Sequence, residues 1–215
     1  MRFNKKELIS IIQKTEPYKK PKLKLEQYCI DAKCAVDIIY FAGFEFNDIT
    51  NKIIFDLGAG TGRLSIASAF FNPYLVLSID IDWNALQILK TNLKNIRLQS
   101  PVFPLCTDIN HFELRKNSLI QNIAITSIMN PPFGVKTSKA DRIFLEKAFS
   151  FSDVVYSIHL ANNKVHNFIS NYIKKFNWII DYILPFNITL EKSFEFHKQF
   201  KKKIEVNIYR FIKIK

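Results

Sequence analysis

From residue 53 onward, short apolar runs alternate with longer segments in which apolar residues recur every three or four positions. The short runs predict strands at Ile53–Asp56, Leu75–Ile79, Val102–Cys106, Ile123–Met129 and Val154–Ile158. The periodic segments predict helices at 62–71, 83–95, 141–150 and 163–175. Strands that alternate with helices build a doubly wound, mainly parallel sheet with helices on both faces, so an α/β fold is predicted.

The first fifty residues follow a different pattern. Asn4 followed by Glu7 matches a capping box and predicts a short amphipathic helix at the start of the chain. Asp31 is placed to cap a second helix, which we expect to end at Gly43. Between the two helices lies a basic loop bounded by prolines, with the sequence EPYKKPKLKLEQY.

The last forty residues break the alternation of strands and helices. Two β-rich runs, WIIDYILPF and IEVNIYRFIKI, are joined by a charged segment without a helical pattern, which predicts a terminal antiparallel pair. No internal repeat or linker divides the chain. We therefore expect a single domain over residues 1–215. Its N-terminal helical and basic segment, 1–50, would cover the ligand site, and residues 51–215 would form the core.

Positive charge is concentrated at the two ends of the chain. The formal net charge is +12; residues 1–24 and residues 192–215 contribute +6 each, and the middle of the chain balances at zero. Two basic ends on a neutral body could hold a polyanion through phosphate contacts. Solvated lysine-rich faces are the alternative.

Composition limits the other classes of protein. The three cysteines lack metal-ligand spacing, which predicts neither a zinc site nor a disulfide framework of this chain's own. No apolar stretch approaches the ~18 residues of a membrane span. The N-terminus has no apolar core or cleavage site of a signal peptide, so a cytoplasmic protein without membrane association is expected.

A glycine-rich turn, DLGAGTG, follows the first predicted strand directly. Gly58, Gly60 and Gly62 would let the backbone turn tightly and approach a nucleotide-like ligand. Dinucleotide enzymes have similar loops, and glycines at a strand-to-helix turn can be purely structural. The turn alone predicts a nucleotide-like ligand without identifying it.

Acidic residues close the neighbouring strands. Asp80 ends the second strand, where a carboxylate can accept hydrogen bonds from both hydroxyls of a ribose. Asp82 is better placed to cap the next helix. Asp108, just beyond the third strand, could meet an adenine amino group. Asp56 is a further ligand candidate, unless it only holds the glycine turn together.

The tetrapeptide NPPF follows the fourth predicted strand, at the sheet edge where open α/β folds bind ligands. An adenine 6-amine is a poor nucleophile because its lone pair is delocalised. Hydrogen bonds to the Asn130 oxygen and the Pro131 carbonyl would favour a reactive nitrogen, while Pro132 stiffens the turn and Phe133 stacks on an extruded base. A bare NPP can also be only a rigid turn. Together with the glycine turn, it is similar to the site of an S-adenosylmethionine-dependent methyltransferase.

The whole chain resembles the methyltransferase-like protein 5 family and its archaeal-type members, which methylate the 6-amino group of an adenosine in small-subunit ribosomal RNA. The segments that carry the resemblance are KPKLKLEQY, DLGAGTGRLSIAS, SIDIDWNAL, CTDI, IMNPPFGVK and VYSIH. The resemblance implies a Rossmann-like class I fold whose seven strands lie in the order 3-2-1-4-5-7-6. It also implies S-adenosylmethionine as the cofactor and N6-methyladenosine as the product.

Transferred by motif, the resemblance also assigns individual residues. It places the catalytic motif on Asn130 to Phe133, and Ile30 and Leu160 stand where the family has a threonine and a lysine. The implied cofactor contacts are Gln27, Tyr28, Gly58, Thr61, Arg63, Asp80, Asp108 and Ile109.

The resemblance further implies a partner, a small zinc-binding activator protein that pairs with an exposed sheet edge to form a heterodimer. The segment PVFPLC would form such an edge in this fold, because it is apolar on both faces and Pro104 is tolerated only at edges or bulges. Coverage by the chain's own loops is the alternative.

Other substrates remain open from the sequence. The same motif serves methyltransferases of DNA adenine, RNA guanine and protein glutamine, and a cofactor-binding, RNA-associated module without catalysis is a further alternative. The two basic ends argue against a protein substrate. No base-recognition domain of the kind that a DNA enzyme needs is visible in the 215 residues.

Overall fold

The computed structural model describes residues 4–115, 118, 120–134, 140–191 and 201–214, without the side chains of residues 190, 191, 201 and 202. In this part of the chain, seven strands form one sheet in the order β3-β2-β1-β4-β5-β7-β6. The strands are β1 (Ile53–Leu57), β2 (Leu75–Asp80), β3 (Val102–Cys106), β4 (Ile125–Met129), β5 (Val154–Leu160), β6 (Trp178–Glu191) and β7 (Lys201–Lys213). Pairing is parallel from β3 through β5, and β7 is antiparallel to both of its neighbours. The predicted α/β fold and strand order are confirmed.

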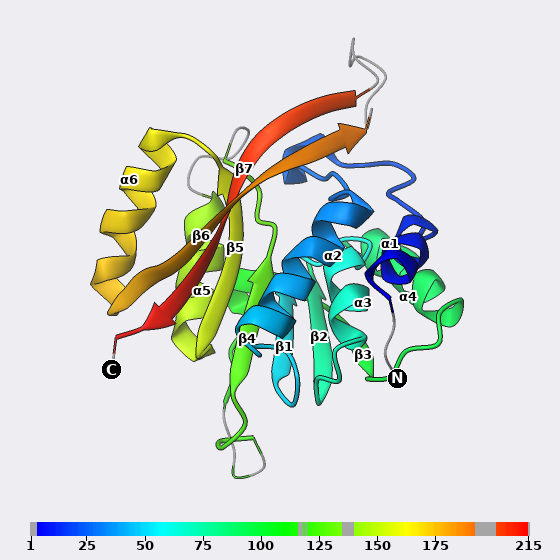
Figure 1. Ribbon diagram of the computed structural model, residues 1–215, viewed down its shortest axis with the longest axis horizontal. Coiled ribbons are helices and arrows are strands. Elements are labelled where there is room, and N and C mark those ends of the chain that lie inside the picture. The colour runs from blue at the N-terminus through cyan, green and yellow to red at the C-terminus, as the bar shows by residue number, and fades with distance from the viewer. Residues whose placement is uncertain (1–3, 116–117, 119, 135–139, 192–200, 215) are drawn as a thin grey trace.

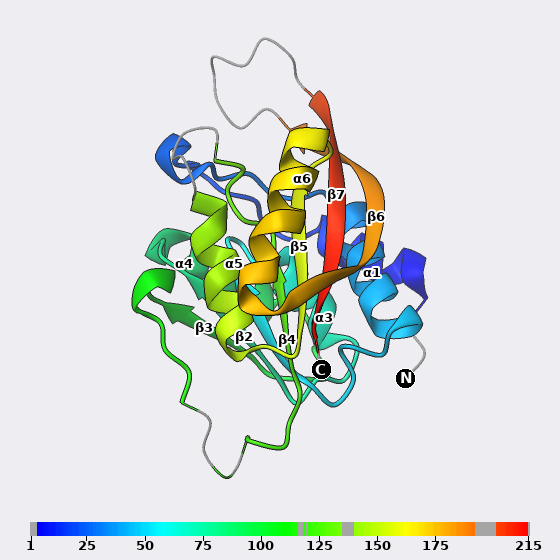
Figure 2. The ribbon, with the colours of Figure 1, turned by 90° about the vertical axis from the view of Figure 1, so that its left-hand side faces the viewer.

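Helices cover both faces of the sheet (Figures 1 and 2). They are α1 (Lys5–Gln13), α2 (Ala32–Tyr40), α3 (Arg63–Ala69), α4 (Trp83–Lys94), α5 (Ala140–Phe151) and α6 (Asn163–Tyr172). The first four pack into one apolar core, while α5 and α6 pack into a second core on the opposite face. No described helix is long and apolar enough to cross a membrane.

The predicted helix starts are confirmed at atomic detail. The Asn4 side chain accepts the Lys6 amide and the Glu7 carboxylate accepts the Asn4 amide, which completes the capping box of α1. Asp31 caps α2 and Asp82 caps α4.

The expected stop at Gly43 is wrong, because the chain continues from α2 into a π-helical turn, Phe41–Glu45. A Cβ atom at Gly43 would lie 2.5 Å from the Phe71 ring, so this glycine allows close packing against Phe71, just after α3, and does not form a left-handed helix end.

The sheet brings the ends of its central strands to the same level. Leu57 at the end of β1 pairs with Ile79 on one side and with Met129 on the other. Both β1 and β4 are buried throughout, as expected for strands covered by helices on both faces. The strand order reverses between β1 and β4, and ligands of open α/β sheets bind at the carboxyl ends beside such a switch.

The terminal hairpin is longer than the strand on which it packs. Strand β7 pairs with β5 only as far as Val206, whereas β6 and β7 stay paired up to Glu191 and Lys201. The free part of the hairpin reaches beyond the carboxyl edge of the sheet (Figure 1). Its Thr189 amide donates to Asp31 at 3.1 Å, which ties the hairpin to the start of α2.

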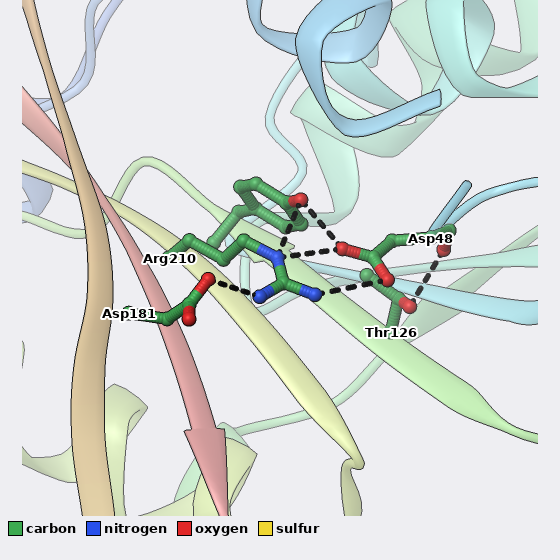
Figure 3. A network of polar contacts seen from close by, with 5 residues as sticks. Asp48, Thr126, Asp181 and Arg210 are labelled. Atoms are coloured by element: carbon green, nitrogen blue, oxygen red, sulfur yellow. Dashed lines mark hydrogen bonds and ion pairs between the residues drawn. The ribbon is translucent and has the colours of Figure 1, made fainter. Parts of the chain in front are cut away.

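A polar cluster lies near the opposite end of β4 (Figure 3). The Arg210 guanidinium donates to the Asp48 carboxylate at 2.8 Å and also to Asp181. The Tyr156 hydroxyl donates to Asp48 at 2.6 Å, and the Thr126 hydroxyl donates to the Asp48 carbonyl at 2.7 Å. These bonds fasten the segment before β1 to β4, β5, β6 and β7.

Candidate active site

A cavity of about 310 Å³ opens at the carboxyl ends of β1, β2 and β4. Residues 24–30 line it from the outer side and are called the covering segment below. Its volume is at the small end of the usual range for ligand pockets. The predicted site residues that line it are Gln27, Tyr28, Asp56, Gly58, Thr61, Arg63, Asp80, Asp108, Ile109, Asn130 and Pro132. The fold therefore brings eleven of the predicted residues, from five separate stretches of sequence, around one space.

Gly60 and Gly62 are outside the lining, although both were expected to give room to a ligand. Gly60 has a φ of +56°, and a Cβ atom there would lie 2.1 Å from the Tyr18 hydroxyl. Gly62 has a φ of +89°, and its Cβ atom would lie 2.1 Å from Leu89 of α4. These glycines are therefore required by the left-handed backbone and by close protein packing behind the cavity.

The Asp80 carboxylate is held by the backbone on both sides. It accepts the Gly60 amide at 2.7 Å and the Asp82 amide at 2.8 Å, so it fixes the glycine turn against the end of β2. Burial raises the pKa of Asp80, and these two hydrogen bonds oppose the rise only in part. The carboxylate faces the cavity in a fixed orientation, as a ribose-binding residue must.

Gln27 is part of the segment that covers the cavity, and it also lines the cavity. Its Nε2 donates to Asp82 at 2.8 Å, and its Oε1 accepts the Lys22 amide at 2.7 Å. Lys22 adds an ion pair to Asp82 at 2.7 Å. Burial opposes ionisation of Asp82, but the bonds from Gln27 and Lys22 outweigh it and lower the pKa of Asp82. Gln27 therefore fastens the covering segment to the cap of α4.

Arg63 at the start of α3 also holds that segment in place. It donates to the Ile30 carbonyl at 2.7 Å and to the Thr15 hydroxyl at 3.2 Å. Beside it, the Thr61 hydroxyl lies 3.4 Å from the Cys29 sulfur. The predicted cofactor contacts at 61 and 63 thus line the cavity, and each is already in contact with the segment that covers it.

Asp56 has the least satisfied side chain of the site. Its Oδ2 accepts the Ser65 hydroxyl at 2.5 Å, whereas its Oδ1 is buried and has no hydrogen-bond partner in the described structure. Burial raises the pKa of Asp56 to about 7, although the bond from Ser65 acts in the opposite direction. A buried oxygen without a partner beside a cavity requires a ligand or a proton to satisfy it.

Asp108 caps a short 3₁₀ turn, Ile109–His111, beyond β3. Its Oδ1 accepts both the amide and the side-chain nitrogen of Asn110, at 2.9 Å each. No group in the described part of the chain donates to its Oδ2. Asp108 can therefore accept one further hydrogen bond from a ligand, and the buried Ile109 gives that end of the cavity an apolar surface.

The NPPF residues separate at the end of β4. Asn130 and Pro132 line the cavity, Pro131 is buried, and Phe133 lies outside the lining. The Asn130 Oδ1 accepts the Tyr28 hydroxyl at 2.8 Å. The rings of Phe133 and Tyr28 lie 5.6 Å apart, and Phe133 also packs against the apolar core that includes α1 to α4. The Tyr28 and Phe133 rings therefore contact each other beside the NPPF motif.

Two aromatic residues of the site were missed by the sequence patterns. Tyr18 lines the cavity beside Gly60, and burial together with the nearby Asp80 raises its pKa. Phe144 of α5 lines the opposite wall and lies 3.2 Å from the position of a Cβ atom at Gly58. The only local signal for Tyr18 was its place in the proline-bounded loop, and Phe144 has the spacing of an ordinary core residue.

His159, near the carboxyl end of β5, is buried, with 2% of its surface exposed. Its Nε2 lies 2.7 Å from the Ser157 hydroxyl, and burial lowers its pKa to about 3. His159 is therefore a neutral, structural histidine.

The chemistry of the cavity fits S-adenosylmethionine. This ligand is an adenosine joined to a methionine, which carries a positively charged sulfonium, an ammonium group and a carboxylate. Asp56, Asp80 and Asp108 surround the cavity, and the described residues offer neither Asp56 nor Asp80 an ion-pair partner. Buried carboxylates that face a cavity and have no ion-pair partner of their own favour a ligand that carries positive charge and hydroxyl donors.

Comparison with known proteins agrees with this site. Residues 44–151 match the model of the methyltransferase small domain. The rRNA N(6)-adenosine-methyltransferase METTL5 of Danio rerio is 33% identical over 96% of this chain and 97% of its own length. An uncharacterized protein of Methanocaldococcus jannaschii is 35% identical over 99% of this chain and 95% of its own length.

The fold has a full-length counterpart among solved structures. A protein of Pyrococcus horikoshii, described as a candidate RNA methyltransferase, is 34% identical, with a TM-score of 0.85 over 98% of both chains. Its likeness extends from α1 to β7, including the covering segment and the terminal hairpin. The chain therefore belongs to the family of Rossmann-like methyltransferases that includes the rRNA N(6)-adenosine-methyltransferase METTL5.

Proposed function

We propose that this protein transfers the methyl group of S-adenosylmethionine to the 6-amino group of an adenosine in small-subunit ribosomal RNA. The observation that carries the proposal is the position of Asn130, which lines the cavity with Asp56, Asp80 and Asp108 and stands at the carboxyl end of β4. The full-length relatives named rRNA N(6)-adenosine-methyltransferases, at 28–33% identity, support the choice of substrate. We place this activity in the cytoplasm.

In the proposed reaction the protein acts by positioning and by polarising the amine. The Asn130 oxygen and the Pro131 carbonyl each accept a hydrogen bond from the target amine, which directs the nitrogen lone pair away from the ring. S-adenosylmethionine supplies a methyl group on a good leaving group when it is bound. As the nitrogen–carbon bond forms, the carbon–sulfur bond breaks, and the amine releases one proton to water. Positioning of this kind can supply several kcal/mol of the barrier reduction.

The proposed cofactor contacts follow from the unsatisfied groups of the cavity. We assign the Asp56 Oδ1 to a cationic group of the ligand, because it is the buried oxygen without a partner. Asp80 is assigned to the ribose and Asp108 to the adenine amine. Gly58, Thr61 and Ile109 complete the walls of the cavity, while Gln27 and Arg63 hold the covering segment in place over the ligand.

Phe133 is proposed to contact the target base from outside the cofactor cavity. It lies beside Tyr28 and outside the cavity lining, so it can stack on a target base only from the outer side of the motif. Base–aromatic stacking contributes about 1–3 kcal/mol per base in single-stranded binding. We therefore assign Phe133 to the target adenosine and not to the cofactor.

The basic ends are the proposed RNA contacts. Lys24 lies at the cavity, and the exposed Lys19 and Lys20 precede it in the same loop. Lys203 is on the part of the hairpin that passes the sheet edge. The C-terminal lysines at 192 and 198 lie outside the described residues.

We also propose a small zinc-binding activator protein as a partner at the β3 edge. Strand β3 ends the sheet, and Phe103 and Leu105 are 51% and 37% exposed on it. Ile81 and Trp83 at the neighbouring turn are exposed as well, at 53% and 55%. An apolar edge of this kind is an aggregation hazard unless another chain covers it.

Co-expression tests the partner. Phe103→Glu should abolish co-purification with the activator, while Phe44→Glu serves as a matched control, because Phe44 is another highly exposed aromatic residue away from β3. A monodisperse monomer with full activity in the absence of any partner would contradict this part of the proposal.

Methyl transfer tests the substrate. Radiolabelled S-adenosylmethionine is incubated with the protein, alone and with the co-expressed activator, and with small-subunit rRNA that lacks the modification, and the nucleosides are then analysed. Label in 6-methyladenosine is the expected result. Label in DNA, in guanosine or in a protein, with unlabelled rRNA adenosine, would overturn the proposed substrate but would leave the assignment as a methyltransferase intact.

A further inference from the structure

Tyr28 joins the covering segment to the catalytic motif. Its hydroxyl lies 2.8 Å from the Asn130 Oδ1, across 102 positions in sequence. The motif-based expectation gave Tyr28 to the cofactor. In the structure, its polar atom is directed at the side chain that would accept the target amine.

The hydrogen bond determines what the Asn130 amide can do. An asparagine side chain has an oxygen that accepts two hydrogen bonds and a nitrogen that only donates. Its terminal torsion is broad and nearly two-fold, so an unsupported amide can turn its nitrogen to the place where the oxygen is needed. A hydroxyl that donates to Oδ1 keeps the oxygen in place and leaves its second lone pair available for the substrate amine.

The Tyr28 hydroxyl is held as a permanent donor. Burial raises the pKa of Tyr28 far above its ordinary value, so the hydroxyl keeps its proton at neutral pH. Its backbone neighbours are fixed as well, because Gln27 is bonded to Asp82 and the Ile30 carbonyl to Arg63. The ring rests 5.6 Å from the Phe133 ring.

We propose that Tyr28 is a positioning residue for the methyl transfer, which holds the Asn130 amide oxygen toward the target amine and makes no polar contact with the cofactor. The proposal rests on the proposed function, since it needs Asn130 as the acceptor of an amine. The covering segment then has two roles, because it closes the cofactor cavity and also completes the catalytic motif.

The test is Tyr28→Phe, which removes the hydroxyl and keeps the ring. We expect kcat at saturating cofactor and RNA to fall about ten-fold, the effect of one net hydrogen bond in the transition state. The dissociation constant of S-adenosylmethionine, measured by isothermal titration calorimetry, should stay within about two-fold. Tyr209→Phe is the matched control: Tyr209 is a buried tyrosine of β7 whose hydroxyl contacts His166, and its kcat should not change.

A double-mutant cycle separates positioning from general structural support. In an Asn130→Ala background the oxygen to be oriented is gone, so adding Tyr28→Phe should cause no further loss of residual kcat. A second, independent ten-fold loss in that background would overturn the proposal.

The remaining outcomes are equally decisive. Weaker cofactor binding with unchanged kcat at saturation would make Tyr28 a cofactor contact. An unchanged or increased kcat would mean that the hydroxyl only occupies the oxygen that the substrate needs. Either result overturns the proposal. If the wild-type protein methylates another amine instead of rRNA adenosine, the ratio of kcat between wild type and Tyr28→Phe is measured on that amine. A wrong substrate can then be distinguished from a wrong role for Tyr28.

Discussion

The two ends of β4 hold polar clusters of opposite design. Near its start, Arg210, Asp48 and Tyr156 satisfy one another with hydrogen bonds of 2.6 to 3.3 Å (Figure 3). Near its carboxyl end, the cavity is lined by Asp56 of the adjacent β1, which has a buried oxygen without a partner in the described structure. The first cluster pairs each buried acid with a cation or a hydroxyl donor, and the second leaves a carboxylate unsatisfied.

The difference shows how the molecule separates stability from binding. A buried carboxylate that is fully paired fixes neighbouring elements in one arrangement. A buried carboxylate without a partner destabilises the empty protein, and this unfavourable energy is relieved when a ligand supplies the missing donor. Substitutions at the first cluster should therefore change unfolding, and substitutions at the second should change binding and catalysis.

The largest expected effect is on stability, from Arg210→Met. This change leaves Asp48 buried without its cation, which typically costs about 3–5 kcal/mol. We expect urea denaturation to show a loss of this size, while the affinity for S-adenosylmethionine below the transition stays within about two-fold. A loss of unfolding free energy below about 1 kcal/mol would show that the cluster contributes little to the stability of the fold.

The next effect is on catalysis, from Asn130→Ala. Removal of the side chain that accepts the amine should lower kcat by about 10²-fold or more, as is usual for a group that assists proton and charge movement. Asn163→Ala, at the exposed start of α6, is the matched control and should leave kcat unchanged. Single-turnover methyl transfer measures both. Equal rates for the two variants would remove Asn130 from the mechanism.

The smallest and most diagnostic effect comes from Asp56→Asn, which keeps an acceptor for Ser65 but removes the charge. Without the carboxylate, a cationic ligand group loses a charge-assisted hydrogen bond, so cofactor binding should weaken about 10-fold to 100-fold. The empty variant should be as stable as the wild type or more stable. Titration calorimetry and urea denaturation measure the two quantities, and weaker binding together with lower stability would contradict the comparison.

The same variant should change the pH dependence of stability. The pKa of Asp56 in the folded protein is raised to about 7, above the value of about 3.9 for an unfolded chain. The folded state thus binds the proton more tightly, and the contribution of Asp56 to stability is complete below about pH 4 and lost as the pH rises through 7. The difference in unfolding free energy between Asp56→Asn and wild type should therefore grow from pH 5 to pH 8.

Local signals in the sequence determined the secondary structure and the place of the site. The caps at Asn4, Asp31 and Asp82 depend on residues two or three positions away, so their patterns can be read directly. The alternation of strands and helices required a parallel sheet, and the carboxyl ends of its strands necessarily brought the glycine turn and NPPF together. The α/β fold class and the place of the site followed from these two facts, whereas the strand order and several of the cavity residues came from the family resemblance.

Only the tertiary structure decided how those residues are used. Gly60 makes room for Tyr18, Gln27 binds Asp82, and Tyr28 binds Asn130, over separations of 42, 55 and 102 positions. No local pattern specifies such pairs, because each depends on where the packed helices and strands bring distant side chains. The buried, unpartnered oxygen of Asp56 is likewise a property of the closed fold, since burial is set by every element that surrounds it.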